Sequence, residues 1–567
     1  MGGKKMKFLN NVMCDRKAGR IGRRALFKCM GATDDDLDAR PLIGIANSWN
    51  ELVPGHVNLR QIAEQVRKGI HQAGGMVAEF GVIGACDGLS NGHEGMYFSL
   101  PSRDLIAGSI EIMARSHKLD GLVMIGSCDK IIPGMMMAAA RLDIPAIIAV
   151  GGPMLGGVVF DNRKSDLTSL AEAYAMKSRN KITEEQLYQL EDLVMPTCGS
   201  CSFYGTANTM CCLAEAMGLS LPGSATIPAV YAERLRSSVD AGKTIVEMTN
   251  HNLTAGKIIT LESLRNAARV LMATGGSTNG VLHLIAVAVE LGFGAEVMMD
   301  ILDAVSKDTP HIAKINPASK YNMEDLHHSG GIPQVMKEIS ALLNLECLTV
   351  TGKSLGENLQ RYKSPYQPDR NVVKTIQEPF NSSKGLAVLR GNLAPNTGIT
   401  KPAAIDPSMM TFTGNAKTFD CEEDATKAVL DGRIGEGDVV VIRYEGPKGG
   451  PGMREMAKVM KYLYGIGLAT KTALVTDGRF SGTNNGCFVG HVSPEAAEGG
   501  PIAVVKDGDR ITIDIPNNTL TLHVPDEEIA ERLKDWRKPE PKYKTGFLSI
   551  YQHLAESADK GAVMRVK

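Results

Sequence analysis

The stretch LDGLVMIGSCDKIIPGMMMAAARLDIPAIIAV, from Leu119 to Val150, contains the repeating unit of an α/β fold. LDGLVMIG predicts a buried strand, IIPGMMMAAARL a helix, and IPAIIAV a second strand. Cys128, Asp129 and Lys130 therefore fall on the turn between a strand and a helix. Such turns lie at the carboxyl ends of parallel strands, where ligands bind in α/β folds. The three residues are candidates for a site, although an ordinary loop is the alternative.

Strand-like and helix-like segments alternate from Pro41 to about Asn344. The other expected strands are PLIGIAN and AEFGVIG. Apolar residues recur at helical spacing in VNLRQIAEQVRKGIHQAG, SRDLIAGSIEIMARSHK and TANTMCCLAEAMGL. Alternation of this kind predicts a mostly parallel sheet with helices on both faces. We therefore expect an α/β domain over residues 1–375.

The composition changes between Lys363 and Lys384, where the chain is polar, contains three prolines and has no clear periodicity. This segment is interpreted as a linker. After it come short, closely spaced strand patterns, namely GDVVVIRYEG, KTALVTDGRF, GPIAVVKDGD, RITIDIP and NTLTLHV. They predict a second, β-rich domain over residues 376–567, in the form of a barrel or sandwich. A helical tail is expected from about Asp526.

Bulk composition excludes several classes of protein. The 567 residues carry a formal net charge of −1 and only 5% aromatic residues, which disfavours nucleic acid as a partner. No apolar run is long enough to span a bilayer, and the first residues are too polar for a signal peptide. A cytoplasmic protein without a membrane partner is expected. Its 11 cysteines then serve as free thiols or metal ligands.

Cys-Asp pairs occur twice, each just after a strand pattern: Cys86-Asp87 and Cys128-Asp129. Thiolates suit iron–sulfur clusters or zinc, whereas carboxylates suit Mg²⁺. If the two strand ends are close, two thiolates could face one centre and two carboxylates another. The alternative is that Asp87 caps a turn and Cys86 is buried.

A CxxC pair, Cys198 and Cys201, precedes a helix pattern. A zinc site would need further ligands, and a thioredoxin-like redox pair lacks its usual surroundings. Cys211 and Cys212 lie within the helix pattern and are interpreted as core residues.

Two glycine-rich loops, GPKGGPGMREM around Glu455 and TDGRFSGTNNG around Ser481, lie in the second domain. Such loops let the backbone approach an anion closely. They are not Walker loops, since GK[ST] is absent, and Ser481 is not in a GxSxG elbow.

Taken together, these segments resemble the dihydroxy-acid dehydratase family, which also holds sugar-acid and phosphogluconate dehydratases. The resemblance extends from about Arg20 to about Leu533. It is carried by NSWNELVPGHVNLR, CDGLSNGHEGM, SLPSRDLIA, SCDKIIPGMMMAAARL, CGSC followed by TANTM, GGSTN, VTGKSLGENL, GNLAPNTG, RYEGPKGGPGMREM, TDGRFSG and GHVSPEAAEGGPIA.

The resemblance implies an iron–sulfur cluster beside a Mg²⁺ ion, and dehydration of a 2,3-dihydroxy acid to a 2-oxo acid. Cys128 and Cys201 match cysteines that bind the cluster, which has two or four irons. Lys130 matches a lysine that is carbamylated in the family, and Ser481 matches the family's proposed catalytic base. The matches to Mg²⁺ ligands are Asp87, Asp129 and Glu455. A homodimer or a dimer of dimers is also implied.

One position departs from the family pattern. Many members have Pro-Cys-Asn where this chain has Pro54-Gly55-His56, and that cysteine is a cluster ligand. Those members usually lack a cysteine at the position of Cys86. We hypothesise that Cys86 supplies the third thiolate, with Cys198 as the competing donor.

The resemblance favours dehydration of 2,3-dihydroxy-3-methylbutanoate and its methylpentanoate homologue in valine and isoleucine synthesis. The alternative is an aldonic acid dehydratase acting on arabinonate, xylonate or gluconate, because SFYGTANTM and AAIDPSMM are similar to sugar-acid members. A non-catalytic iron–sulfur protein is a second alternative, and a zinc-stabilised protein a third. The Mg²⁺ ligands and the base argue against the last two.

Overall fold

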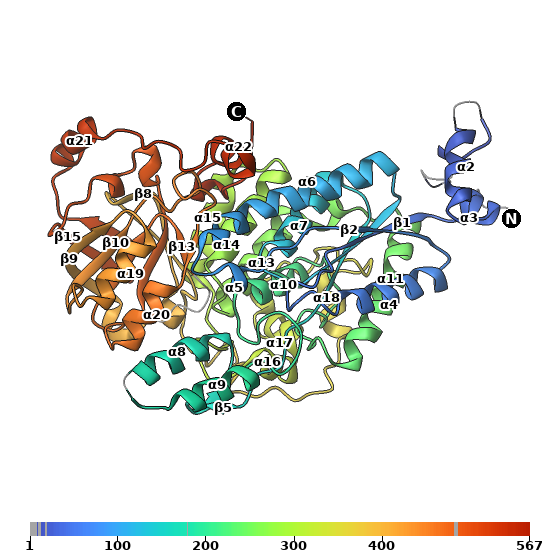
Figure 1. The fold of residues 1–567 in the computed structure, drawn as a ribbon. Coiled ribbons are helices and arrows are strands. Elements are labelled where there is room, and N and C mark those ends of the chain that lie inside the picture. The colour runs from blue at the N-terminus through green and yellow to red at the C-terminus, as the bar shows by residue number, and fades with distance from the viewer. Residues whose placement is uncertain (1–7, 9–12, 18–19, 179, 481–485, 567) are drawn as a thin grey trace.

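The computed structural model describes residues 8, 13–17, 20–178, 180–480 and 486–566 (Figure 1). The quoted stretch folds as β3 (Gly121–Gly126), α7 (Ile131–Leu142) and β4 (Ala146–Val150), as predicted. With β1 (Leu42–Asn47) and β2 (Met76–Gly81) these strands form a parallel sheet in the order β2-β1-β3-β4. Every residue of β3 is buried, as expected for a strand covered on both faces.

Helices cover both faces of this sheet. α4 (Leu59–Gln72) and α11 (Ala232–Asn250) pack together on one face, and α6 (Ser99–His117) packs with α7 on the other (Figure 1). The apolar side chains of α4 recur at helical spacing and are buried against the sheet. This part confirms the predicted α/β fold.

The expected alternation as far as Asn344 is wrong beyond β4, because helices dominate there. A small hairpin, formed by β5 (Val159–Phe160) and β6 (Arg163–Lys164), precedes them. The helices are α8 (Leu167–Ser178), α9 (Glu184–Leu193), α10 (Thr206–Ala216), α11, α12 (Ala255–Ile258), α13 (Leu261–Ala273), α14 (Asn279–Glu290), α15 (Ala295–Asp308), α16 (Met323–His328), α17 (Gly331–Glu338) and α18 (Leu355–Arg361). Residues 279–288 of α14 are all buried, so this helix is surrounded by other elements instead of flanking a strand.

The C-terminal part is a closed barrel, in the order β10-β12-β14-β8-β7-β16-β15-β9. Its strands are β7 (Ala387–Gly391), β8 (Ala394–Thr400), β9 (Thr411–Phe419), β10 (Asp438–Ile442), β12 (Ala473–Thr476), β14 (Cys487–Ser493), β15 (Arg510–Asp514) and β16 (Thr519–Leu522). Closure leaves no unpaired sheet edge. The barrel prediction is confirmed, except that GPIAVVKDGD contains a 3₁₀ helix (Pro501–Val504) and no strand. Pro501 lacks the N–H that a ladder requires.

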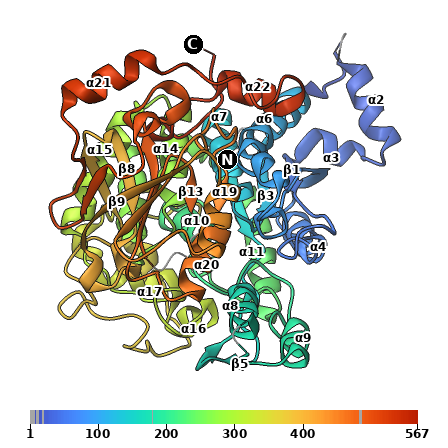
Figure 2. The ribbon, with the colours of Figure 1, turned by 60° about the vertical axis from the view of Figure 1, so that its left-hand side comes forward.

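Four helices accompany the barrel. α19 (Glu422–Leu430) and α20 (Lys458–Gly465) pack against each other beside it, and α21 (Asp526–Asp535) and α22 (Gly546–Leu554) form the predicted helical tail (Figure 2). The tail returns to the first part of the chain: buried Arg103 on α6 donates hydrogen bonds to the carbonyl oxygens of Gly561 and Ala562.

The predicted linker has no regular element between α18 and β7. Isolated bridges join Val373 to Ala313 and Asn381 to His311, so the linker runs along the first part of the chain. A domain boundary at residues 375 and 376 stays a prediction.

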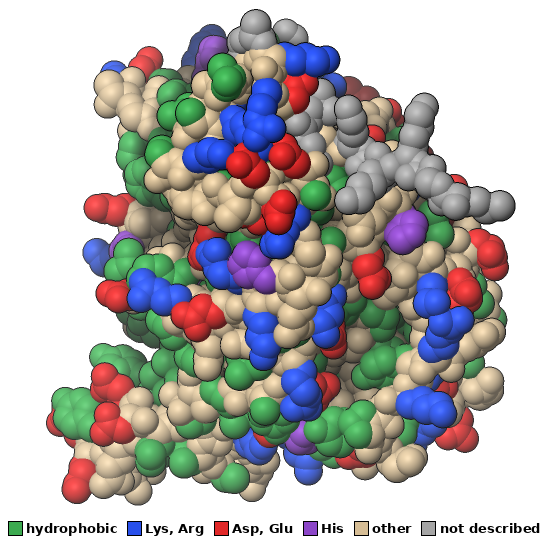
Figure 3. All heavy atoms as spheres, turned by 90° about the vertical axis from the view of Figure 1, so that its right-hand side faces the viewer, with side chains coloured by type: hydrophobic (Ala, Val, Ile, Leu, Met, Phe, Trp, Pro, Cys, Tyr) green, Lys and Arg blue, Asp and Glu red, His purple; other side chains and the backbone are tan. Residues whose placement is uncertain are grey.

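Helices α2 (Ile21–Cys29) and α3 (Asp34–Ala39) project from the body of the molecule (Figure 1). On the face that carries them, acidic and basic side chains of the described residues are interspersed (Figure 3). Within the described ranges, none of the helices combines the length and the apolar character that crossing a membrane requires.

Candidate active site

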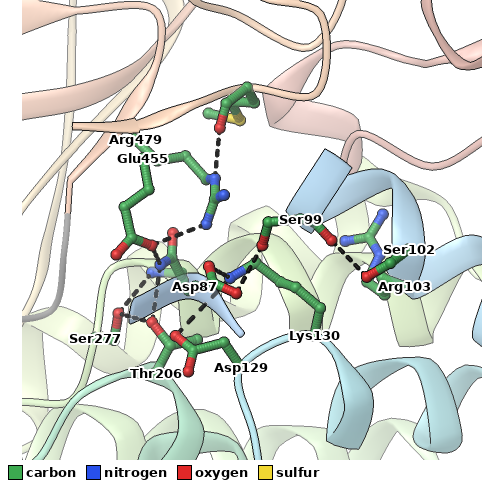
Figure 4. A network of polar contacts seen from close by, with 12 residues as sticks. Asp87, Ser99, Ser102, Arg103, Asp129, Lys130, Thr206, Ser277, Glu455 and Arg479 are labelled. Carbon is green, nitrogen blue, oxygen red and sulfur yellow. Dashed lines mark hydrogen bonds and ion pairs between the residues drawn. The ribbon is translucent and has the colours of Figure 1, made fainter. Parts of the chain in front are cut away.

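Three carboxylates from distant parts of the chain meet where the two parts face each other (Figure 4). Asp87 begins α5 (Asp87–Ser90) after β2, and Asp129 lies in the turn between β3 and α7. Glu455 belongs to β11 (Glu455–Met456), a two-residue strand beside the barrel. One oxygen from each residue lies within 4.8 Å of the other two. The sequence prediction that the two Cys-Asp turns converge is therefore confirmed for their carboxylates.

Two buried cations hold this cluster. The Lys130 ammonium lies 2.5 Å from Oδ2 of Asp87 and 3.8 Å from Oδ2 of Asp129. Arg479, in β13 (Arg479–Phe480), lies 3.1 Å from Oε2 of Glu455. β11 and β13 pair in register with Glu455 opposite Arg479, so the small two-stranded sheet itself creates this ion pair.

The three carboxylates of the cluster differ in the direction of their pKa shifts. Burial and the Asp87 carboxylate raise the pKa of Asp129 to about 7. Burial also raises the pKa of Glu455. For Asp87, burial is outweighed by the Lys130 and Arg479 charges, which hold its pKa below the usual value. Buried carboxylates that repel one another are stabilised by a bound cation.

Several polar residues that the sequence analysis did not assign position the cluster. Asn279, at the start of α14, donates to Oε2 of Glu455 at 3.0 Å and to Oγ1 of Thr206 at 2.8 Å. Ser99 donates to Oδ1 of Asp87 at 2.6 Å. The motifs GGSTN, SLPSRD and TDGRF contain Asn279, Ser99 and Arg479. In the sequence, Asn279 and Ser99 could be noticed only as polar residues at the start of a helix. Nothing in the spacing of these residues indicates which carboxylate each one contacts.

Three thiols gather beside the carboxylates. Burial raises the pKa of Cys128 well above its usual value, and the neighbouring Cys86 and Cys201 groups raise it further. The thiol of Cys201 responds in the same way to burial, Asp129 and Cys86. Since these groups influence one another electrostatically, the structure brings Cys86, Cys128 and Cys201 into one neighbourhood.

Gly55 lies against the same thiols. A Cβ atom at this position would be 2.7 Å from Sγ of Cys128 and 3.1 Å from the backbone nitrogen of Ser200. The position where many family members have a cysteine is therefore adjacent to Cys128. In this chain the glycine lets the backbone pack directly against Cys128 and Ser200, with no room for a Cβ atom unless a neighbour shifts.

We expect Gly55→Ala to lower the stability of the cofactor-free protein by about 1–3 kcal/mol, because the added methyl group overpacks a tight site. The measurement is the midpoint of urea unfolding. Gly22→Ala is the control, since a Cβ there has no neighbour within 4 Å. Equal midpoints for both variants and the parent would contradict the tight packing at Gly55.

Other cysteines are placed differently. In the described residues, burial raises the pKa of Cys198, and no second cysteine contributes to that shift. Cys211 and Cys212 are fully buried in α10, which confirms their interpretation as core residues. The structure thus places Cys86, and not Cys198, within the group around Cys128.

A cavity of about 290 Å³ opens beside the carboxylates and Cys201. One wall comes from α8 and another from α20, which pack against each other (Figures 1 and 2). Its lining includes apolar side chains, namely Leu167, Ala171, Phe203, Ala207, Ala457 and Tyr462. Polar lining is supplied by Asn91, Thr168, Thr206, Asn208, Lys458 and Lys461.

Ser481, the base that the resemblance implies, lies outside the described residues. Arg479, two positions before it in the sequence, is described and pairs with Glu455.

Comparison with known proteins agrees with this arrangement. The profile described as dihydroxy-acid/6-phosphogluconate dehydratase N-terminal matches residues 40–358, and its C-terminal counterpart matches residues 371–562.

Curated relatives named dihydroxy-acid dehydratase match along nearly the whole chain. The relative from Caldanaerobacter subterraneus subsp. tengcongensis is 51% identical over 96% of this chain and 97% of its own length. The Caldicellulosiruptor saccharolyticus relative is 52% identical, with the same coverage of both chains. The Methanosarcina barkeri relative is 48% identical over 96% of this chain and 98% of its own length. The chain belongs to the dihydroxy-acid/6-phosphogluconate dehydratase family.

Proposed function

We propose that this protein is a dihydroxy-acid dehydratase, a hydro-lyase that converts 2,3-dihydroxy-3-methylbutanoate and its methylpentanoate homologue to 2-oxo acids in valine and isoleucine synthesis. The observation that carries the proposal is the cavity that is lined by Asp87, Asp129 and Glu455 together with Cys201. Oxygen atoms, which are hard ligands, and a sulfur atom, which is a soft ligand, therefore line the same cavity, and such a cavity suits a small-molecule substrate.

Mg²⁺ fits the carboxylate cluster. Oxygen ligands from two buried carboxylates and one partly buried carboxylate converge within 4.8 Å, and their mutual repulsion disfavours ionisation in the absence of a bound metal ion. We propose Asp87, Asp129 and Glu455 as ligands. Lys130, whose side chain is fully buried beside two of them, is proposed to contribute a fourth oxygen as its carbamate.

An iron–sulfur cluster fits the group of Cys86, Cys128 and Cys201. Burial raises the pKa of Cys128 and Cys201, with a further contribution from Cys86 to both, and such thiols are stabilised when a metal centre accepts them as thiolates. With three thiolate ligands from the chain, such a cluster would keep a ligand position for substrate. When bound, Mg²⁺ would supply charge stabilisation at the substrate carboxylate and 2-hydroxyl, and the cluster would supply a Lewis acid for the departing 3-hydroxyl.

The chain's own residues then have separate tasks. Ser481, the base that the resemblance implies, takes the proton from C2. Arg479 and Asn279 hold Glu455, while Ser99 holds Asp87. As the C2–H bond breaks, its electron pair forms the C2–C3 double bond and the C3–O bond breaks. The departing hydroxide takes up the proton that left C2 and leaves as water, and the enol tautomerises to the 2-oxo acid. Electrons are not transferred to any acceptor.

The cavity lining favours the branched acid over a sugar acid. Leu167, Ala171 and Phe203 offer apolar contacts to a methyl-bearing carbon chain, and burying each methylene contributes about 0.8 kcal/mol. An aldonic acid would place several hydroxyl groups against the same side chains, which cannot pair with them.

Turnover of both substrate classes by anaerobically purified, cluster-loaded protein with Mg²⁺ tests the proposal. We expect kcat/KM for 2,3-dihydroxy-3-methylbutanoate to exceed that for arabinonate, xylonate and gluconate by about 100-fold, because unpaired hydroxyl groups are costly to bury. The measurement is 2-oxo acid formation. Preference for an aldonic acid would move the protein to sugar-acid breakdown, and absence of any turnover would refute the dehydratase assignment.

We also propose that the protein acts in the cytoplasm as a homodimer or a dimer of dimers. Its 11 free cysteines fit a reducing compartment. Phe98, just before α6, and Leu105 and Ile112 on α6 are exposed apolar side chains seven residues apart, which fits contact with a second copy.

A further inference from the structure

The short segment that carries Glu455 is anchored to α19 on both sides of that residue. β11 consists of Glu455 and Met456 alone, and α20 begins two residues later, at Lys458 (Figure 2). An isolated two-stranded ladder is marginally stable at best, so β11 needs further support. That support comes from the first two residues of α19, Glu422 and Glu423. The contacts of α19 therefore determine where the backbone of Glu455 lies.

Before Glu455, the anchor is the buried side chain of Arg454. Its guanidinium donates twice to Glu423, from Nη1 to Oε1 at 2.6 Å and from Nη2 to Oε2 at 2.9 Å. Nη2 also donates to the buried carboxylate of Glu445. A bidentate pair fixes a guanidinium in direction as well as in distance. The residue that immediately precedes Glu455 is thus held by two carboxylates.

The same guanidinium also reaches the first part of the chain. Its central carbon lies 5.0 Å from the centre of the Tyr97 ring, which is a cation–π contact. Tyr97 belongs to the 3₁₀ helix Glu94–Phe98, which follows α5 and therefore Asp87. Arg454 consequently joins the segment of Glu455 to the segment of Asp87.

After Glu455, the anchor is the buried carboxylate of Glu422. Its Oε1 accepts hydrogen bonds from the backbone N–H groups of Ala457 at 3.1 Å, Lys458 at 2.9 Å and Val459 at 3.5 Å. Ala457 occupies the cap position of α20 and has no side-chain cap hydrogen bond of its own. Glu422 therefore satisfies from α19 the free N–H groups at the start of α20. This fixes the chain directly after β11.

Resting on the proposed dehydratase function, in which Glu455 binds Mg²⁺, we propose that Arg454 and Glu422 are positioning residues for Glu455. Neither is among the described residues that line the cavity, so each acts on the metal ligand only through the backbone beside it. A carboxylate that is already in place loses less freedom when it binds an ion than a mobile one does. The two anchors therefore raise the affinity of the site for Mg²⁺.

Titration of cluster-loaded protein with Mg²⁺ alone, followed by calorimetry, tests the proposal. The variants are Arg454→Met and Glu422→Ala. Arg443→Met is the control for the first, because the hydrogen bonds of the Arg443 guanidinium run to Asp420 and to carbonyl oxygens elsewhere beside the barrel. Asp424→Ala is the control for the second, because it removes another acidic residue from the first turn of α19.

We expect the dissociation constant for Mg²⁺ to rise by about 10-fold in Arg454→Met and Glu422→Ala, and to stay within about 2-fold of the parental value in both controls. Iron and sulfide content should stay parental in all four. Excess Mg²⁺ should restore kcat for 2,3-dihydroxy-3-methylbutanoate to within about 3-fold of the parent, since the bound ion then holds Glu455 itself. A residue that only stabilised the fold would lower the unfolding midpoint without changing the dissociation constant.

Different results overturn different claims. A parental dissociation constant in both variants refutes the positioning role, and so does an equal rise in Arg443→Met, because that pattern indicates general loosening of the barrel. If Arg454→Met does not fold, Glu423→Gln decides, since it changes an exposed carboxylate and keeps the buried arginine. It should raise the constant by about 3-fold, and an unchanged constant refutes the proposal. A parent protein that binds no Mg²⁺ refutes the proposed metal site, and the dehydratase function with it.

Discussion

Replacement of Cys86 by serine is expected to abolish retention of iron and sulfide and to lower turnover by roughly 100-fold or more, because the remaining two thiolates hold a cluster weakly. Cys86 lies after β2 and acts electrostatically on both Cys128 and Cys201, so its thiol belongs to the same group. The measurement is iron and sulfide content per chain after anaerobic reconstitution, with visible absorption as a second readout.

Cys198→Ser is the matched control. Cys198 is also partly buried and lies three positions from Cys201, but burial alone raises its pKa. This variant should retain parental iron and sulfide. If Cys198→Ser lost the cluster and Cys86→Ser kept it, the third ligand would be Cys198.

Asp129→Asn is expected to lower turnover by about 100-fold and to remove the stabilisation that Mg²⁺ confers. Asp129 is one of the three converging carboxylates, and burial beside Asp87 raises its pKa to about 7. An amide in its place is a poorer Mg²⁺ ligand but does not repel Asp87. The Mg²⁺-free variant should therefore unfold at a higher temperature than the Mg²⁺-free parent.

Thermal unfolding with and without Mg²⁺ measures both effects. The parent should gain stability with Mg²⁺, whereas Asp129→Asn should not respond. Asp300→Asn, an exposed substitution on α15, serves as the control and should behave as the parent does. A Mg²⁺ response in Asp129→Asn equal to that of the parent would exclude Asp129 as a ligand.

Local sequence patterns predicted much of the fold. The buried run of β3 and the apolar spacing of α4 each specify their element through nearby residues. The prediction failed in two regions: the chain after β4, where helices are packed on helices, and the 3₁₀ helix at Pro501. In both, short apolar runs are compatible with strand or helix, and tertiary packing selects between them.

The candidate site was predictable to a similar extent. Two strands of one parallel sheet are each followed by a Cys-Asp pair, Cys86-Asp87 and Cys128-Asp129. Because these strands run in the same direction, the two pairs lie at the same edge of the sheet. Family resemblance, and no local pattern, added Glu455 and Ser481. The contact of Asn279 with Glu455, 176 positions apart, had no local signal at all.

By itself, the sequence determined the strand ends that present the cysteines and aspartates, because hydrophobic periodicity is a local property of the chain. It also determined the family. Only the tertiary structure decided that Glu455 and Arg479 approach that sheet edge, that Gly55 packs directly against Cys128, and that Lys461 lines the same cavity. The reason is that these contacts join segments far apart in the chain, and their geometry depends on how the barrel and the helices pack against the sheet.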